Sequence, residues 1–203
     1  MLVADIATGV ERAHRAMDAL EQMLNQADAA LGDGDTGSML ARVIAHMAQA
    51  DVKEAGDVGA AFAMLARTAL AGTGSSLGTL MATGFMILSR ETRGETDVDW
   101  GRLAGLLAAA RDAMIARGGA KLGDKTVLDA LDAVARACEG LSDPAAIGGA
   151  AREAARQALD AYREKPCRIG RARMFAERSV GKDDPGMLAF TRLAEALVPG
   201  AGR

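Results

Sequence analysis

Three aspartates and three glycines follow one another closely around residue 30 of the chain. Asp28 precedes the run Gly32-Asp33-Gly34-Asp35-Thr36-Gly37, so three carboxylates fall within eight residues. Carboxylate oxygens are the ligands that Mg²⁺ and Ca²⁺ prefer, and a Mg²⁺ held by few protein ligands keeps room for substrate phosphates. This segment therefore predicts a metal–nucleotide site.

Two known motifs overlap this segment without fitting it. The glycines match G-x-G-x-x-G, but the residues before them repeat with helical period, whereas a dinucleotide-binding fold requires a strand there. An EF-hand loop beginning at Asp33 would place Ile44 where the bidentate glutamate belongs. A structural alternative remains, because aspartate and glycine are also common caps at helix ends.

Composition favours a helical protein of one domain over residues 1–203. Apolar residues make up 50% of the chain and aromatic residues only 3%, a balance that suits close-packed helices better than strands. A net charge of −3 and a pI near 5.5 give no basic surface for nucleic acid. The two cysteines lack the spacing of a zinc site or disulfide framework. Without a signal peptide or a long apolar segment, the protein is expected in the cytoplasm and away from membranes.

Apolar residues recur every three or four positions along most of the chain, as in amphipathic helices. The longest such series runs from Val3 to Leu31, with Asp28 beside it in the last turn. The pattern predicts an all-α bundle of eight antiparallel amphipathic helices, at about residues 3–31, 38–50, 58–70, 79–90, 99–115, 127–138, 144–164 and 187–197.

Four glycine-rich loops are expected at the same end of this bundle. Short up-and-down connections place every second loop together, which groups residues 32–37, 71–78, 117–126 and 166–186. Backbone N–H groups at such turns and at helix N-termini bind phosphate oxygens. The segment 119–126 lacks the adjacent Gly-Lys of a P-loop, so a nucleotide site of another type is predicted.

The motifs taken together resemble a known family. They are Leu24-Asn25, Asp28, residues 32–38 (GDGDTGS), residues 118–128 (GGAKLGDKTVL), residues 170–173 (GRAR), residues 177–179 (ERS) and residues 184–186 (DPG). In this order they resemble the nucleotide-binding L subunit, or C-terminal domain, of dihydroxyacetone kinases. The resemblance covers essentially the whole chain. It implies an eight-helix antiparallel barrel that holds ADP or ATP at one end through two Mg²⁺ ions.

The resemblance also implies roles for individual residues. The metal ligands would be Asp28, Asp33 and Asp35. The residues at the phosphates would be Thr36, Gly37, Ser38, Gly72 and Thr73, and the nucleotide would be lined by Gly118, Val127, Arg171, Asp184, Pro185 and Gly186. Arg171 and Lys125 could add positive charge at the phosphates, or they could be exposed cations at helix ends. No residue of the chain is predicted to be a catalytic base, and both His14 and His46 are expected to be satisfied or solvent-facing.

The family has two branches, and position 36 helps to choose between them. Subunits fed by the phosphoenolpyruvate phosphotransferase system keep ADP as a bound coenzyme and usually carry histidine where this chain has Thr36. The sequence therefore favours the ATP-dependent branch, with a short ketose held on a histidine of a separate K subunit. The alternatives are a phosphotransferase-fed subunit, with a phosphocarrier as a further partner, and a non-catalytic ADP-loaded module that docks on a regulator. The identity of the ketose stays open at this stage.

Overall fold

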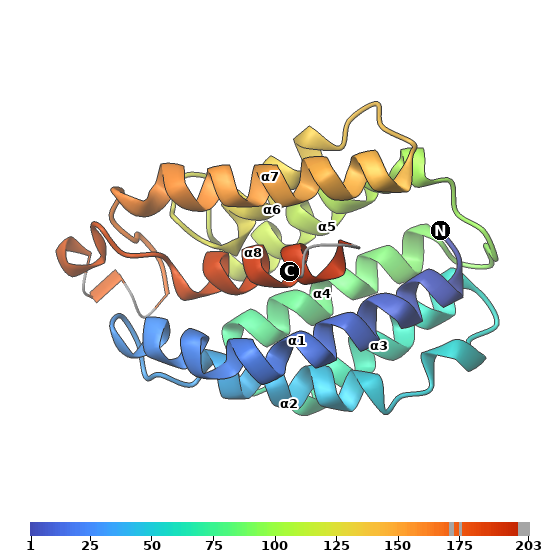
Figure 1. Cartoon of the computed structure of the whole chain (residues 1–203), viewed down its shortest axis with the longest axis horizontal. Helices are drawn as coiled ribbons and strands as arrows, with labels where there is room; N and C mark the ends of the chain where they lie inside the picture. The colour runs from blue at the N-terminus through green and yellow to red at the C-terminus, as the bar shows by residue number, and fades with distance from the viewer. Residues whose placement is uncertain (171–172, 175, 199–203) are drawn as a thin grey trace.

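The computed structural model describes residues 1–170, 173–174 and 176–198, and within them the chain is built from α-helices without a β-strand (Figure 1). Short 3₁₀ turns are η1 (Val52–Glu54), η2 (Trp100–Arg102) and η4 (Glu177–Ser179). The described α-helices are α1 (Val3–Ala29), α2 (Thr36–Ala48), α3 (Val58–Gly72), α4 (Ser76–Glu91), α5 (Leu103–Gly118), α6 (Val127–Ala137), α7 (Pro144–Arg163) and α8 (Pro185–Leu197). They confirm the predicted all-α fold of eight helices.

Helix α1 follows its predicted apolar face closely. Ile6, Met17 and Leu24 on that face are buried, and Leu24 is 0% exposed. At 1.5 Å per residue, its 27 residues span about 40 Å. The helix is therefore long enough to run along the bundle and to place Asp28 at the end of it.

Several helices begin at residues other than those predicted, and for α4 and α8 the reason is a side chain that caps the helix start. Helix α4 begins at Ser76 instead of residue 79, since the Ser75 hydroxyl accepts a hydrogen bond from the amide of Gly78 at 3.1 Å. Helix α8 begins at Pro185 instead of residue 187, where the Asp184 carboxylate accepts from the amide of Met187 at 2.8 Å. Helix α5 begins at Leu103 instead of near residue 99, after the η2 turn.

The helices form a closed ring around one main core. Each helix packs against the next along the chain, and α8 packs against α1 as well as α6 and α7, which closes the ring. Small residues allow the helices to approach closely: a Cβ atom added at Gly59 on α3 would lie 2.8 Å from the backbone oxygen of Ser89 on α4. No helix in the described part of the chain is both long and apolar enough to cross a lipid bilayer.

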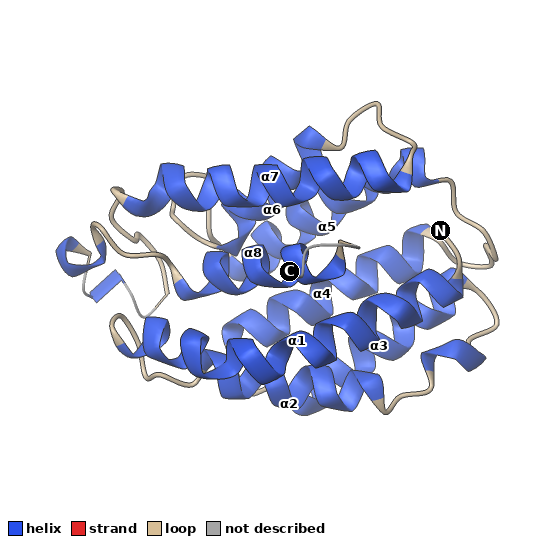
Figure 2. Cartoon of the chain, in the orientation of Figure 1, coloured by secondary structure: helices blue, strands red, loops and turns tan. Residues whose placement is uncertain are grey.

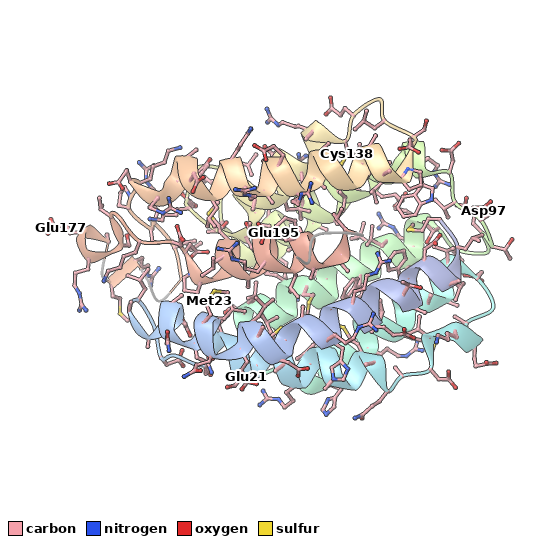
Figure 3. All side chains as sticks on the ribbon, viewed as in Figure 1. Glu21, Met23, Asp97, Cys138, Glu177 and Glu195 are labelled. Atoms are coloured by element: carbon pink, nitrogen blue, oxygen red, sulfur yellow. The ribbon has the colours of Figure 1, made fainter. Side chains whose placement is uncertain are left out.

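The loops after α1, α3, α5 and α7 meet at one end of the bundle, here called the loop end (Figure 2). Leu31, after α1, packs with Cys167, after α7. The amide of Arg168 donates to the carbonyl oxygen of Asp124, in the loop after α5, at 3.1 Å. Figure 3 places Glu177 at the outer tip of the loop end and Asp97 at the opposite end of the molecule. The predicted grouping of these loops is therefore observed.

Candidate nucleotide and metal site

Three carboxylates converge where α1 runs into α2. Asp28 lies in the last turn of α1, and Asp33 and Asp35 lie in the loop that follows. Each offers one carboxylate oxygen, and these oxygens lie within 4.8 Å of one another. We call these three residues the carboxylate cluster. Three oxygen donors at this spacing suit a hard divalent cation such as Mg²⁺.

The backbone of this loop is shaped around Asp28, which is 8% exposed. Its Oδ2 atom accepts hydrogen bonds from the amides of Asp35 at 2.9 Å and Thr36 at 3.1 Å, and so caps the start of α2. Its Oδ1 atom lies beside Gly32, where an added Cβ atom would be only 2.5 Å away. Gly34 has φ +80°, a conformation that glycine adopts readily. The capping alternative is thus correct for one oxygen of Asp28, and the other lies beside Gly32.

The first turn of α2 is fixed to α1 by Glu21 and Asn25, two residues for which no role was predicted from the sequence. A Cβ atom added at the buried Gly37 would overlap the backbone oxygen of Glu21. The Ser38 hydroxyl donates to Glu21 Oε1 at 2.8 Å and accepts from Asn25 Nδ2 at 2.9 Å. The Ser38 amide donates to Asn25 Oδ1 at 3.0 Å. The hydroxyl of Ser38 is therefore engaged with α1, and the spacing of Asn25 one turn before Asp28 was the available signal for it.

The loop after α3 lies beside α2 and at the start of α4. Gly72 sits against Val43 of α2, and its carbonyl oxygen accepts from Arg42 Nε at 3.1 Å. The Thr73 hydroxyl accepts from the amide of Ser75 at 3.1 Å and fills the space where a side chain at position 78 would be. Gly72 thus contacts α2 about two turns beyond Thr36. The loop after α3 therefore lies further along the bundle than the loop after α1.

The remaining predicted lining residues meet around the first turns of α4, α6 and α8. A Cβ atom added at Gly186 would lie 3.6 Å from Cβ of Val127 and 3.8 Å from Cδ1 of Leu77. One turn further along α4, Leu80 packs against Gly118 at the end of α5. Pro185 is buried in the first turn of α8. Arg171, the predicted cation at the phosphates, lies outside the described residues.

Asp184 combines a cap with an unusual acidity. Although the residue as a whole is half-buried, its carboxyl group is surrounded by protein, and this desolvation raises the pKa of Asp184 to about 6. The amide of Met187 and the ammonium of Lys125 oppose the rise because both favour the charged form. Asp184 therefore titrates closer to neutrality than an ordinary aspartate.

Lys125 was expected either to add positive charge at the phosphates or to be an exposed cation at a helix end, and the structure differs from both. The side chain is 1% exposed, so it is not a cation at an open helix end. Its Nζ atom donates to the carbonyl oxygens of Arg163 at 2.9 Å, Lys165 at 2.7 Å and Ser179 at 2.8 Å. Those three bonds use all the donors of an ammonium group, so the group is committed to carbonyl oxygens. The expectations failed because the three acceptors come from segments 38 to 54 residues away.

The loop before α6 is fixed by hydrogen bonds to Asp129, a residue that was assigned no role from the sequence. The buried Asp129 accepts from the amide of Gly123 at 2.5 Å and from the amide of Thr126 at 2.8 Å. Burial, with Asp129 adding to it as neighbour and hydrogen-bond partner, raises the pKa of Tyr162 to about 12. A capping pattern was the available signal, since Asp129 stands three residues after Thr126.

The two histidines are exposed, on α1 and α2, in agreement with the solvent-facing expectation. A cavity of about 300 Å³ lies away from the predicted site residues and is lined by Glu91, Gly101 and Arg102 among others. Since these residues belong to α4's C-terminal end and the start of α5, the cavity is at the opposite end from the carboxylate cluster.

Comparison with known proteins identifies related domains. A family model described as the DAK2 domain matches residues 30–199, a range that begins just after Asp28. The chain is 29% identical over 181 residues to the Listeria innocua protein named PEP-dependent dihydroxyacetone kinase 1, ADP-binding subunit DhaL; the match covers 88% of this chain and 86% of that protein. It is 35% identical over 188 residues to the L-erythrulose 1-kinase of Mycolicibacterium smegmatis, covering 87% of this chain and 32% of the kinase.

Solved structures of dihydroxyacetone kinase also match this chain. The dihydroxyacetone kinase of C. freundii in complex with AMP-PNP and Mg²⁺ matches with a TM-score of 0.74 at 26% identity. The match covers 96% of this chain and 33% of that one. The chain therefore spans about a third of the longer kinases and most of the shorter Listeria subunit.

Proposed function

The chain belongs to the DAK2 domain family, as a DhaL-like domain, and from this premise we propose that it is the nucleotide-binding part of a kinase for a short ketose. The phosphoryl group would pass from Mg²⁺-bound ATP to dihydroxyacetone or a related ketose held by a K-type partner. The carboxylate cluster carries the proposal, because its three carboxylate oxygens lie within 4.8 Å of one another, the spacing expected of the ligands of one metal ion, beside the glycine-rich loops. The relatives support it, since their names describe kinases and an ADP-binding subunit.

The charge of the cluster supports two Mg²⁺ ions. Three carboxylates beside a polyphosphate would repel it strongly, and divalent cations remove that repulsion. When bound, Mg²⁺ would neutralise charge on the transferring phosphoryl group and orient it. The exposed Asp33 and Asp35 would hold the ions together with one oxygen of Asp28, whose other oxygen fixes the turn that presents them.

The protein's own contribution is positioning. The N-terminal ends of α2 and α4, the positive ends of their helix dipoles, lie at the same end as the cluster and attract phosphate oxygens. Val127, Leu77 and Gly186 form an apolar wall in contact distance of one another, suited to a nucleoside. Phosphoryl transfer depends mainly on positioning and charge neutralisation, so this set of groups suits the reaction.

The experiment is an activity assay with the purified chain. It would be mixed with Mg²⁺-ATP, a K-type partner and either dihydroxyacetone or erythrulose, and both ADP and phosphorylated ketose would be measured. We expect both products in equal amounts, and their loss in Asp35→Asn. Asp18→Asn, an exposed site on α1, makes the same charge change and should keep activity. A wild-type chain that forms neither product with any partner and ketose would contradict the proposal.

A second candidate is a phosphotransferase-fed subunit, favoured by the Listeria relative whose length the chain matches over 86%. In that case ADP would remain bound and be rephosphorylated in place. Thr36, at the position where that branch usually has histidine, favours exchange instead. Dialysis of the ADP-loaded protein against excess ATP separates the two: exchange supports the ATP-dependent reaction, and retained ADP supports the alternative.

A further inference from the structure

The ammonium of Lys125 occupies a complete site inside the protein. It is enclosed at 1% exposure, and its three N–H groups point to three backbone oxygens at 2.7 to 2.9 Å. These acceptors belong to Arg163, Lys165 and Ser179. We call this arrangement the Lys125 anchor. Ordinary lysines are almost never fully buried unless paired, so such an environment indicates a defined task.

One of the three oxygens belongs to Arg163, the last residue of α7, where carbonyl groups have no partner within the helix, and a second belongs to Lys165, two residues later. A positive charge there is favoured both by hydrogen bonding and by the helix dipole. The ammonium therefore caps α7 from outside, delivered by the loop between α5 and α6. The third oxygen, of the buried Ser179, brings the η4 turn to the same point.

Further bonds gather around the anchor. The amide of Cys167 donates to the Ser179 hydroxyl at 2.8 Å, and the amide of Gly181 donates to the Arg163 carbonyl at 3.0 Å. Arg163 also forms an ion pair with Asp183 at 2.8 Å, next to Asp184. Lys125 itself has φ +62°, a costly conformation for a residue with a side chain, which the three hydrogen bonds stabilise.

The anchor joins the two segments of the chain that precede Val127 and Gly186 of the apolar wall. Val127 follows Lys125 by two residues, while Asp184 and Gly186 follow the segment that Lys125 holds. We propose that Lys125 is a positioning residue that fixes the α7–α8 connection against the start of α6, and so sets the spacing between Val127 and Gly186. Its effect on nucleotide affinity rests on the function proposed above. Its effect on the α7–α8 connection does not.

The test compares Lys125→Met with Lys182→Met. Methionine keeps the length of the side chain and removes its charge, and Lys182 is an exposed lysine of the connected segment. Hydrogen exchange is read by NMR without nucleotide at the amides of Cys167, Arg168 and Gly181, and at Gly32, which bonds to Asp28 in the loop after α1. Lys125→Met should speed exchange at the first three amides at least tenfold and leave Gly32 within twofold. Lys182→Met should change none of them.

Chemical rescue supplies a readout that general destabilisation would not give. Lys125→Ala removes three carbons and the nitrogen, which is the framework of n-propylammonium. Adding n-propylammonium should restore slow exchange at Cys167 and Gly181, whereas n-propanol, of similar size but uncharged, should not. Mg²⁺-ADP affinity, measured by calorimetry, should fall at least tenfold in Lys125→Ala and recover with n-propylammonium.

Each outcome either supports or overturns the proposal that Lys125 is a positioning residue. Wild-type exchange in Lys125→Met overturns the proposal, as does equal acceleration at Gly32 without rescue of Lys125→Ala. If Lys125→Met fails to fold, recovery of Lys125→Ala in n-propylammonium supports the anchor, and failure to recover overturns it. If the wild-type chain does not bind Mg²⁺-ADP, the proposed function fails while the exchange comparison still tests the anchor. Local exchange changes with unaltered ADP affinity overturn the positioning of the nucleotide wall.

Discussion

The carboxylate cluster and the Lys125 anchor lie at the same end of the bundle and treat charge in opposite ways. In the cluster, backbone amides hold one aspartate from inside while two others remain exposed. In the anchor, backbone carbonyls enclose a single ammonium completely. Exposed carboxylates can exchange a ligand, whereas a buried ammonium with all donors engaged can only hold structure. Burial and hydrogen-bond partners, and not the sign of the charge alone, therefore determine the role of each group.

The largest expected effect concerns stability and falls on the anchor. Lys125→Met leaves three carbonyl groups without their charged donor, and we expect a loss of about 3 kcal/mol in the free energy of unfolding. Lys182→Met should change it by less than about 0.5 kcal/mol, since the side chain is exposed. Urea denaturation measures both. A loss below about 1 kcal/mol for Lys125→Met would show that the anchor is not structural.

The second prediction separates the roles inside the cluster. Asp28→Ala removes the acceptor for two amides at the start of α2 and should cost about 2 kcal/mol even without metal. Asp35→Asn should keep the wild-type free energy of unfolding within about 0.5 kcal/mol and lose the stabilisation that Mg²⁺ gives the wild type. Thermal melting with and without Mg²⁺ checks both. Equal melting temperatures for the two metal-free variants would contradict the division of roles.

The helices and the cluster could be predicted from the sequence because both depend on local spacing. The apolar series of α1 and the run of aspartates around residue 30 are readable within one segment. The starts of α4 and α8 were placed late because Ser75 and Asp184 cap them, and Ser and Asp also occur in ordinary loops. The burial of Lys125 could not be read at all, since its acceptors are backbone oxygens of distant segments whose identity leaves no residue signature.

The smallest effect is a pH dependence at Asp184, whose pKa is raised from 3.8 to about 6. A raised pKa means that the folded state keeps a proton that the unfolded state releases, so this contribution to stability is present at low pH and lost as the pH rises through about 4 to 6. Asp184→Asn removes the titration and keeps an oxygen to cap α8. Relative to the variant, the wild type should lose on the order of 1–2 kcal/mol in its free energy of unfolding between pH 4 and pH 7. This loss is smaller than the full pKa shift would give, because the residue as a whole is only half-buried and solvent screens part of the effect.

The control for this pH comparison is Asp18→Asn, exposed on α1. Its free energy of unfolding should follow the wild-type pH curve. Parallel curves for wild type and Asp184→Asn would mean that Asp184 titrates as an ordinary aspartate. Because the charge of Lys125 helps to hold the pKa of Asp184 down, the difference should grow in a Lys125→Met background that still folds.

The central claim is that the carboxylate cluster binds nucleotide through divalent metal, and calorimetry of ADP binding tests it most directly. The wild type should bind ADP in Mg²⁺ and lose that binding in excess EDTA. Asp35→Asn should bind about 100-fold more weakly in Mg²⁺, the loss expected for one charged contact, while Asp18→Asn binds as the wild type does. Equal affinity of wild type and Asp35→Asn, or equal affinity in Mg²⁺ and in EDTA, would contradict the account.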